Sequence, residues 1–118
     1  MRRKYVIDEG LQNFMFEINI THLRENADAA SQFLKALANS DRLLLLCQLS
    51  QGERTVSDLD LLLGIRQPTL FQQLAVLRRE GVVETRRDGK QVFYRIGSPV
   101  ALAVIQTLYQ QFCAGEAE

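Results

Sequence analysis

The stretch of sequence that decides the fold is TVSDLDLLLGIRQPTLFQQLAVLRREG, residues 55–81. Its first part predicts a short helix, because Thr55-Val56-Ser57-Asp58 has the form of a capping box with Asp in place of the usual Glu or Gln, and Gly64 ends the apolar pattern. Its second part predicts a longer helix over 67–80, because Pro68 suits a first helical turn and leucines recur at helical spacing. Two helices joined by a tight, glycine-containing turn are typical of a helix-turn-helix.

The residues that follow change from a helical period to a period of two. Residues 82–87 and 90–96 predict two strands, and Asp88-Gly89 predicts the tight turn between them, because both residues accept the positive φ that such a turn needs. A hairpin directly behind a helix-turn-helix makes it winged. The predicted fold class is therefore mainly α with a β-hairpin wing (α+β), a winged helix-turn-helix.

Two helices are predicted ahead of this unit. Apolar residues at helical spacing predict the first helix over 25–37. Cap-forming residues at 39–41 predict the start of the second helix, over 40–49. On the second helix, Leu43, Leu44 and Cys47 share one apolar face.

The last helix, predicted over 99–113, is apolar on more than one face. A terminal helix of this kind needs a partner surface beyond its own domain, which favours a homodimer. We expect an N-terminal arm over 1–22, one winged helix-turn-helix domain for DNA binding and dimerisation over 23–114, and a tail over 115–118.

The chain has 118 residues, of which 47% are hydrophobic and 24% charged, enough for one domain with its own core. This composition excludes an intrinsically disordered chain. No apolar run approaches the roughly 20 residues that a membrane helix needs, and the basic start Arg2-Arg3-Lys4 does not lead into the apolar segment of a signal peptide. We expect a soluble, cytoplasmic protein with no membrane partner.

Charge is balanced over the whole chain but not along it. The formal net charge is zero, yet seven basic and three acidic residues between Arg66 and Arg95 give that segment a charge of +4. A local basic patch on a neutral protein favours docking on a polyanion, so we expect double-stranded DNA as the partner. Glutamine and threonine at a helix N-terminus can contact base edges and phosphates, and cations at a hairpin tip can contact the DNA backbone. The candidate DNA-binding residues are Arg66, Gln67, Thr69, Phe71, Gln72, Gln73, Arg79, Arg86, Arg87 and Lys90.

The two cysteines, Cys47 and Cys113, and the one histidine, His22, do not have the number or spacing of a zinc finger or a disulfide framework. The cysteines are either buried apolar fillers or one deliberate pair. A thiol enzyme would need an activating base or a Cys-x-x-Cys motif, and the sequence has neither. We expect no catalytic residues, no metal site and no cofactor.

Several motifs resemble the ArsR/SmtB family of small winged-helix repressors. They are Leu34-Lys35-Ala36-Leu37-Ala38-Asn39-Ser40-Asp41-Arg42-Leu43, Gln67-Pro68-Thr69-Leu70 with Gln72-Gln73-Leu74, Leu77-Arg78, Gly81-Val82-Val83 and Phe93-Tyr94-Arg95-Ile96. The resemblance covers about residues 27–113. It implies a homodimer joined through its first and last helices, two recognition helices in successive major grooves of an operator, and release of the DNA when an inducer is sensed.

The chain departs from the family pattern in three places. Arsenic, cadmium and lead sensors of the family carry Cys-x-Cys in the short third helix, and residues 56–60 of this chain hold no cysteine. Zinc and nickel sensors carry His and acidic pairs on the last helix, which here has neither before Glu116. Phe71 stands where the family usually has a small polar residue, commonly Ser, and it either contacts a thymine methyl or packs inward.

The positions of Cys47 and Cys113 are similar to those of the cysteine pair in the sulfur- and redox-responsive branch of the family (BigR- and SqrR-like regulators). That resemblance implies that the pair senses reactive sulfur species (persulfide, polysulfide or hydrogen sulfide) or an oxidant, by forming a disulfide or a sulfur-bridged link. Such a link joins two helices and can shift the recognition helices.

Other functions stay open at this point. The chain could be a regulator of virulence or biofilm genes whose cysteines are structural and which has no thiol switch, or it could hold a non-standard metal site. Two further classes are a thiol enzyme and a dimeric interaction module without salt-dependent affinity for DNA.

Overall fold

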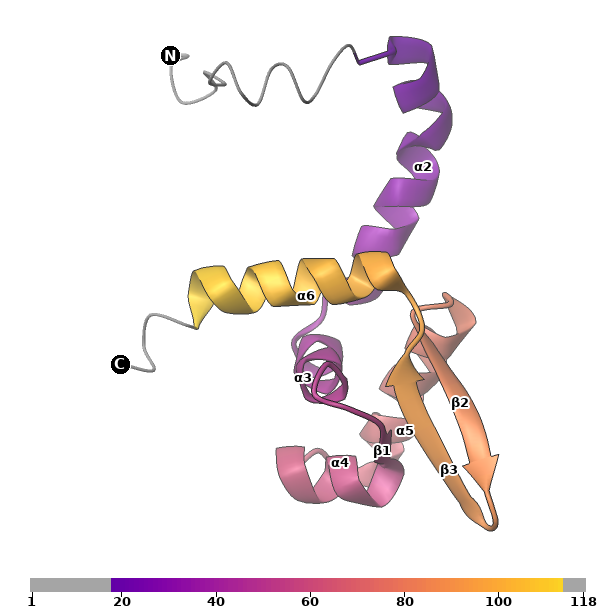
Figure 1. Ribbon diagram of the computed structural model, residues 1–118, viewed down its shortest axis with the longest axis vertical. Helices are drawn as coiled ribbons and strands as arrows, with labels where there is room; N and C mark the ends of the chain where they lie inside the picture. The colour runs from indigo at the N-terminus through magenta and orange to yellow at the C-terminus, as the bar shows by residue number, and fades with distance from the viewer. Residues whose placement is uncertain (1–17, 114–118) are drawn as a thin grey trace. The chain divides into compact units, whose positions relative to one another are not determined.

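The computed structural model describes residues 18–113 and is mainly helical with one small antiparallel sheet (Figure 1). The predicted winged helix-turn-helix is confirmed. The chain divides after Gln32 into two compact units, so residues 18–32 are described by themselves. The elements are α2 (Ile20–Leu37), α3 (Ser40–Leu49), β1 (Arg54–Thr55), α4 (Val56–Leu63), α5 (Gln67–Arg79), β2 (Val83–Asp88), β3 (Gln91–Ile96) and α6 (Pro99–Phe112).

The first unit contains the N-terminal part of α2. This helix begins at Ile20, five residues before the predicted start at residue 25, so part of the predicted arm is helical. The start is set by Asn19, whose Oδ1 accepts a hydrogen bond from the backbone N–H of His22 at 3.0 Å. Every side chain over 18–32 is exposed. Residues 1–17 of the predicted arm, and the predicted tail, lie outside the described residues.

The sheet has three strands in the order β1-β3-β2, one more than the predicted hairpin. β1 pairs with β3 through Arg54 opposite Tyr94, and two residues are too short a run to show a strand period in sequence. The predicted turn is wrong by one residue, because Asp88 still pairs with Gln91 and the turn is Gly89-Lys90. Gly89 takes the positive φ, +65°, that Asp88 was also expected to take.

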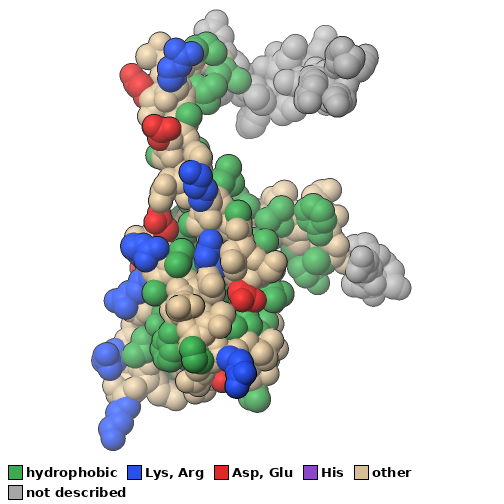
Figure 2. Space-filling model, turned by 180° about the vertical axis from the view of Figure 1, so that it is seen from behind, with side chains coloured by type: hydrophobic (Ala, Val, Ile, Leu, Met, Phe, Trp, Pro, Cys, Tyr) green, Lys and Arg blue, Asp and Glu red, His purple; other side chains and the backbone are tan. Residues whose placement is uncertain are grey.

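The hairpin of β2 and β3 projects from the helices of its unit. Figure 2 shows Lys and Arg side chains along the edge that carries this hairpin, down to its tip. The wing therefore places positive charge away from the core, where a long polyanion can reach it.

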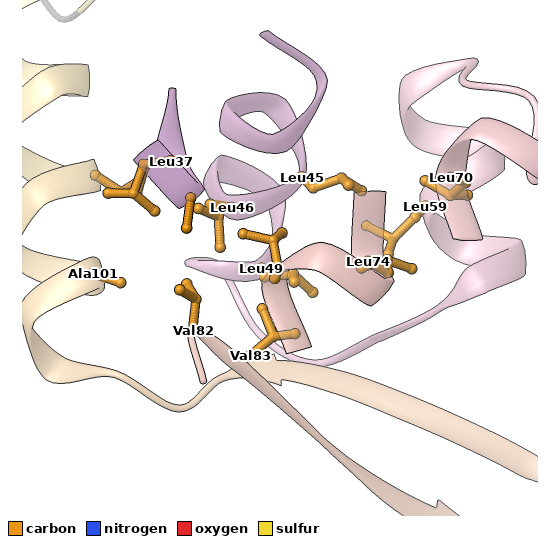
Figure 3. Close-up of a cluster of buried hydrophobic side chains, with 13 residues drawn as sticks. Leu37, Leu45, Leu46, Leu49, Leu59, Leu70, Leu74, Val82, Val83 and Ala101 are labelled. Atoms are coloured by element: carbon orange, nitrogen blue, oxygen red, sulfur yellow. The ribbon is translucent and has the colours of Figure 1, made fainter. Parts of the chain in front are cut away.

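The core of the second unit is a cluster of buried leucines from α3, α4 and α5 (Figure 3). From α3 it takes Leu45, Leu46 and Leu49, while Leu43 and Cys47 of the predicted face are partly buried against it and Leu44 is 47% exposed. Four consecutive leucines over 43–46 offer two apolar faces, so the period alone could not choose between them. The other large side chains that are fully buried are Leu59 of α4, Leu70, Leu74 and Leu77 of α5, Val82, and Ile105 of α6.

Two predicted caps delimit the helix-turn-helix. Thr55 Oγ1 accepts from the Asp58 N–H at 3.1 Å, and Asp58 Oδ2 accepts from the Thr55 N–H at 3.0 Å, so the capping box with Asp is confirmed. Gly64 ends α4 in the left-handed conformation at φ +70°. The two residues that follow lead directly into α5, which holds the two helices in a fixed relation.

The last helix, α6, is capped by Ser98, whose side chain accepts from the Ala101 N–H at 3.0 Å. It buries Ala101 and Ile105 and leaves Val100, Tyr109 and Phe112 exposed, so it is apolar on its outer side as predicted. Within residues 18–113, no helix combines the length and the apolar character needed to cross a membrane.

We expect Leu59→Ala to destabilise the domain by about 2–5 kcal/mol, because this leucine is fully buried and its loss leaves a cavity. Leu61→Ala on the same helix is the matched control, since Leu61 is 86% exposed, and it should change stability by less than about 0.5 kcal/mol. Urea unfolding followed by circular dichroism measures both. Equal losses would contradict the assignment of the buried face of α4.

Candidate DNA-binding surface and cysteine pair

The outward face of α5 carries most of the predicted DNA-binding residues. Burial of the α5 leucines turns Gln67, Gln72 and Arg79 towards solvent, while Thr69 is half-buried. Phe71 is 51% exposed, so it does not pack inward. Arg66 precedes the helix, whose first backbone N–H groups receive no side-chain cap. Free N–H groups and the helix dipole at this end favour a phosphate.

Gln73 differs from the other predicted residues on α5. It is half-buried, and its Oε1 accepts a hydrogen bond from Arg42 Nη1 at 2.7 Å. No local pattern in the sequence connects Arg42 with Gln73, because the two residues lie 31 positions apart.

In the wing, Arg86 is tied to Glu53 from the loop before β1. Arg86 Nε lies 3.0 and 2.9 Å from the two carboxylate oxygens, and Nη2 lies 2.8 Å from Oε1. The guanidinium also lies over the ring of Phe93, 4.6 Å from its centre. Glu53 therefore holds the wing at Arg86, midway along β2, and it had no signal in the sequence because the two residues lie 33 positions apart.

The other wing cations have different surroundings. Arg95 Nε on β3 lies 3.1 Å from Glu84 Oε2 on the neighbouring strand β2. Arg87 and Lys90 are exposed and have no ion pair among residues 18–113. The uncompensated charge of the wing therefore lies at its tip.

The hydrogen bond from Arg86 lowers the pKa of the Glu53 carboxyl below its ordinary value. The same pair raises the pKa of Arg86, again chiefly through the hydrogen bond. Because the folded-state pKa of Glu53 is lowered, the stability from this pair is present above the ordinary glutamate pKa and is lost as the pH falls through the lowered one.

The two cysteines belong to the second unit and line the same cavity. Cys47 is on α3 and half-buried, and Cys113 follows the last residue of α6 and is exposed. The cavity holds about 250 Å³ and its other walls are apolar: Leu43, Ile105, Leu108, Tyr109 and Phe112. Both thiols are free.

Cys47 also borders a second, more polar cavity of about 730 Å³. Its walls include four glutamine side chains: Gln48, Gln51, Gln106 and Gln110. Burial, and then the nearby Cys113, raise the pKa of the Cys47 thiol, so less of it is thiolate at neutral pH. Among the described residues, no three His, Cys, Asp or Glu side chains gather in a way that could hold a metal ion.

We expect Arg86→Gln to raise the pKa of Glu53 towards the ordinary glutamate value, because the hydrogen bond that stabilises the carboxylate is lost. Arg87→Gln removes an equal charge from the same strand without touching Glu53, so it should leave this pKa nearly unchanged. A carbon-detected NMR titration of the side-chain carboxyls measures both. Equal shifts in the two variants would show that Glu53 responds to net charge alone.

We expect iodoacetamide at neutral pH to modify Cys113 several-fold faster than Cys47, because Cys113 is exposed and burial disfavours the Cys47 thiolate. Mass spectrometry of the cysteine peptides over time measures the two rates. Cys113→Ser should leave only the slow phase, and a fast phase that survives in this variant would contradict the assignment.

Three comparisons place the chain among known proteins. Residues 39–85 match the family described as bacterial regulatory protein, arsR family. The Biofilm growth-associated repressor of Agrobacterium fabrum is 48% identical over 100 residues, which cover 85% of this chain and 86% of that protein. The crystal structure of the transcriptional repressor BigR from Xylella fastidiosa is similar with a TM-score of 0.75 at 43% identity, over 82% of this chain and 99% of that one.

A further similar structure is a homodimeric winged helix-turn-helix DNA-binding domain from Mycobacterium bovis, with a TM-score of 0.67 at 33% identity, over 80% of this chain and 85% of that one. These relatives are regulators and not enzymes. The chain is a DNA-binding transcriptional regulator, and it belongs to the arsR family of bacterial regulatory proteins.

Proposed function

We propose that this regulator is a homodimeric repressor that releases its DNA operator when Cys47 and Cys113 become linked through sulfur. The observation that carries the proposal is that the two thiols, one on α3 and one directly after α6, line one cavity. Membership in the family accounts for the DNA binding, and the link between the two cysteines is the event that ends it.

The operator contacts come from α5 and the tip of the wing. Residues at the N-terminal end of α5 reach base edges and phosphates, and the half-exposed ring of Phe71 contacts a thymine methyl. In the wing, Arg87 and Lys90 hold the DNA backbone, and Arg86 positions the wing through Glu53. The proposed contact residues are Arg66, Gln67, Thr69, Phe71, Gln72, Gln73, Arg79, Arg87 and Lys90.

A second copy of the chain covers apolar surface on the first and last helices. On α6 the exposed residues are Val100, Tyr109 and Phe112, and on the N-terminal part of α2 they are Ile20 and Leu23. Large apolar side chains exposed on two helices are typical of an obligate interface. The similar domain from Mycobacterium bovis is homodimeric, which supports the same assembly here.

The sulfur chemistry proceeds in two balanced steps. The exposed Cys113 thiolate attacks a sulfane sulfur of an inorganic polysulfide, which forms a Cys113 persulfide and releases the shortened polysulfide. The Cys47 thiolate then attacks the inner sulfur of that persulfide, which forms the disulfide and releases hydrosulfide. The two thiols are oxidised by two electrons, and one sulfane sulfur is reduced. If both thiols first become persulfides, the same displacement leaves a bridge with one additional sulfur.

The link would reach the DNA surface through α3. This helix carries Cys47, packs its leucines against the leucines of α5, and contacts α5 through Arg42. A bond from Cys47 to the end of α6 restrains α3, and so it favours one arrangement of the helix pair over another.

A second candidate function keeps the cysteines structural. The half-burial of Cys47 and its raised pKa favour an unreactive thiol, and the chain would then repress genes without a chemical inducer. The name of the Agrobacterium relative points to biofilm genes as the regulated set. Both candidates share the DNA-binding surface and differ only in the response to sulfur.

We expect sodium tetrasulfide to lower the affinity of the protein for DNA at least about ten-fold, and dithiothreitol to restore it. The probe is a fluorescent duplex selected from a random pool by the reduced protein, and fluorescence anisotropy measures binding. Intact mass should show loss of both free thiols within one chain, with or without an added sulfur atom.

The single variants Cys47→Ser and Cys113→Ser are the controls, because each should bind the duplex like the reduced protein and keep that affinity after tetrasulfide. Release of DNA from the double Cys→Ser variant, or full binding by wild-type protein with both thiols unreactive, would favour structural cysteines. Light scattering during the same experiment reports whether the binding species is a dimer.

A further inference from the structure

The Arg42 guanidinium joins three helices of the second unit. From α3, its Nε donates to the Ala36 carbonyl at 2.6 Å and its Nη2 donates to the Lys35 carbonyl at 3.2 Å. These carbonyls belong to the last turn of α2, where the usual partner four residues further on is missing, and the Lys35 carbonyl also accepts from the Ala38 N–H at 3.3 Å. The third bond, from Nη1 to Gln73 Oε1 at 2.7 Å, reaches α5. Two bonds to α2 thus fix the guanidinium that holds Gln73.

This geometry decides which end of the Gln73 amide faces the protein. Arginine has five N–H donors and no acceptor, so the atom bonded to it is the amide oxygen and not the nitrogen. The bond is charge-assisted, and it is short at 2.7 Å. The amide nitrogen of Gln73 has no hydrogen-bond partner among residues 18–113, and the side chain is partly exposed.

A glutamine held in this way can donate to a base but cannot read adenine in the usual manner. The bidentate contact to adenine needs the oxygen to accept from N6 while the nitrogen donates to N7. Although an amide oxygen has two lone pairs, its bond to Arg42 holds it towards the protein, so Gln73 presents its N–H groups to a base. Those groups suit the acceptors of the major groove, which are guanine O6 and N7, adenine N7 and thymine O4, and they do not suit the amino group of cytosine. Adenine also presents its N6 amino group, which a side chain that only donates leaves without a partner, so guanine and thymine suit this glutamine better.

We propose that Arg42 is a positioning residue that makes Gln73 a donor-only reader, and that Gln73 selects guanine or thymine at one position of each operator half-site. This inference rests on the proposed use of α5 as the helix that reads DNA. It is independent of the cysteines, so it concerns the reduced protein alone.

The test sequences the duplexes that the reduced protein enriches from a randomised pool. Gln73→Glu keeps an oxygen on Arg42 and replaces the donors by a second acceptor. We expect the preference for guanine or thymine over cytosine at one position to fall about five-fold or more, with the rest of the motif unchanged. Gln72→Glu is the matched control, because Gln72 is exposed and has no bond to Arg42, so any change it causes should occur at another position.

Arg42→Gln is the second test variant, because loss of the guanidinium frees the Gln73 oxygen for the bidentate contact with adenine. We expect adenine to rise at the same position in this variant. Arg42 also holds the end of α2, so circular dichroism checks that the variant is folded; if it is not, Gln73→Glu decides alone.

An unchanged preference in Gln73→Glu, or a folded Arg42→Gln that gains no adenine, would overturn the inference and leave the proposed function intact. A reduced wild-type protein that enriches no motif at all would overturn the proposed function as well.

Discussion

The burial of three leucines on one side of α5 is the constraint on which the rest of the molecule depends. Leu70, Leu74 and Leu77 are fully or almost fully buried against α3 and α4. Because an α-helix has 3.6 residues per turn, fixing these three positions also fixes which residues face away. The face of α5 that we propose reads DNA is thus a consequence of the core, and a change in packing between α3 and α5 would change the orientation of that face.

Much of this architecture could be predicted from the sequence because its signals are local. The capping box at Thr55, the glycine at 64 and the proline at 68 each act within one turn of chain, and together they determine where α4 ends and α5 begins. The apolar run over 43–46 carried no such signal, since both of its faces are leucine. β1 escaped prediction because its two residues become a strand only by pairing with β3.

The same difference between local signals and contacts across the chain applies to the candidate site. Its exposed residues on α5 and its two cysteines could be named from pattern and resemblance. The contacts that orient them could not, because Arg42 meets Gln73 across 31 residues and Glu53 meets Arg86 across 33. Such pairs arise when separate elements pack together, and in each of them a side chain expected to meet DNA is held by the protein itself. Resemblance can identify which residues face a ligand, whereas the hydrogen-bonding state of each one depends on its own neighbours.

The order of strands has one more consequence, for solubility. In the sheet β1-β3-β2, one edge is only two residues long and the other is β2. An open edge strand invites pairing with the edge of another molecule, and proteins commonly prevent this with charged side chains. Four of the six residues of β2 are charged, namely Glu84, Arg86, Arg87 and Asp88. The edge formed by β2 can therefore stay exposed with little tendency to pair with the sheet of another molecule.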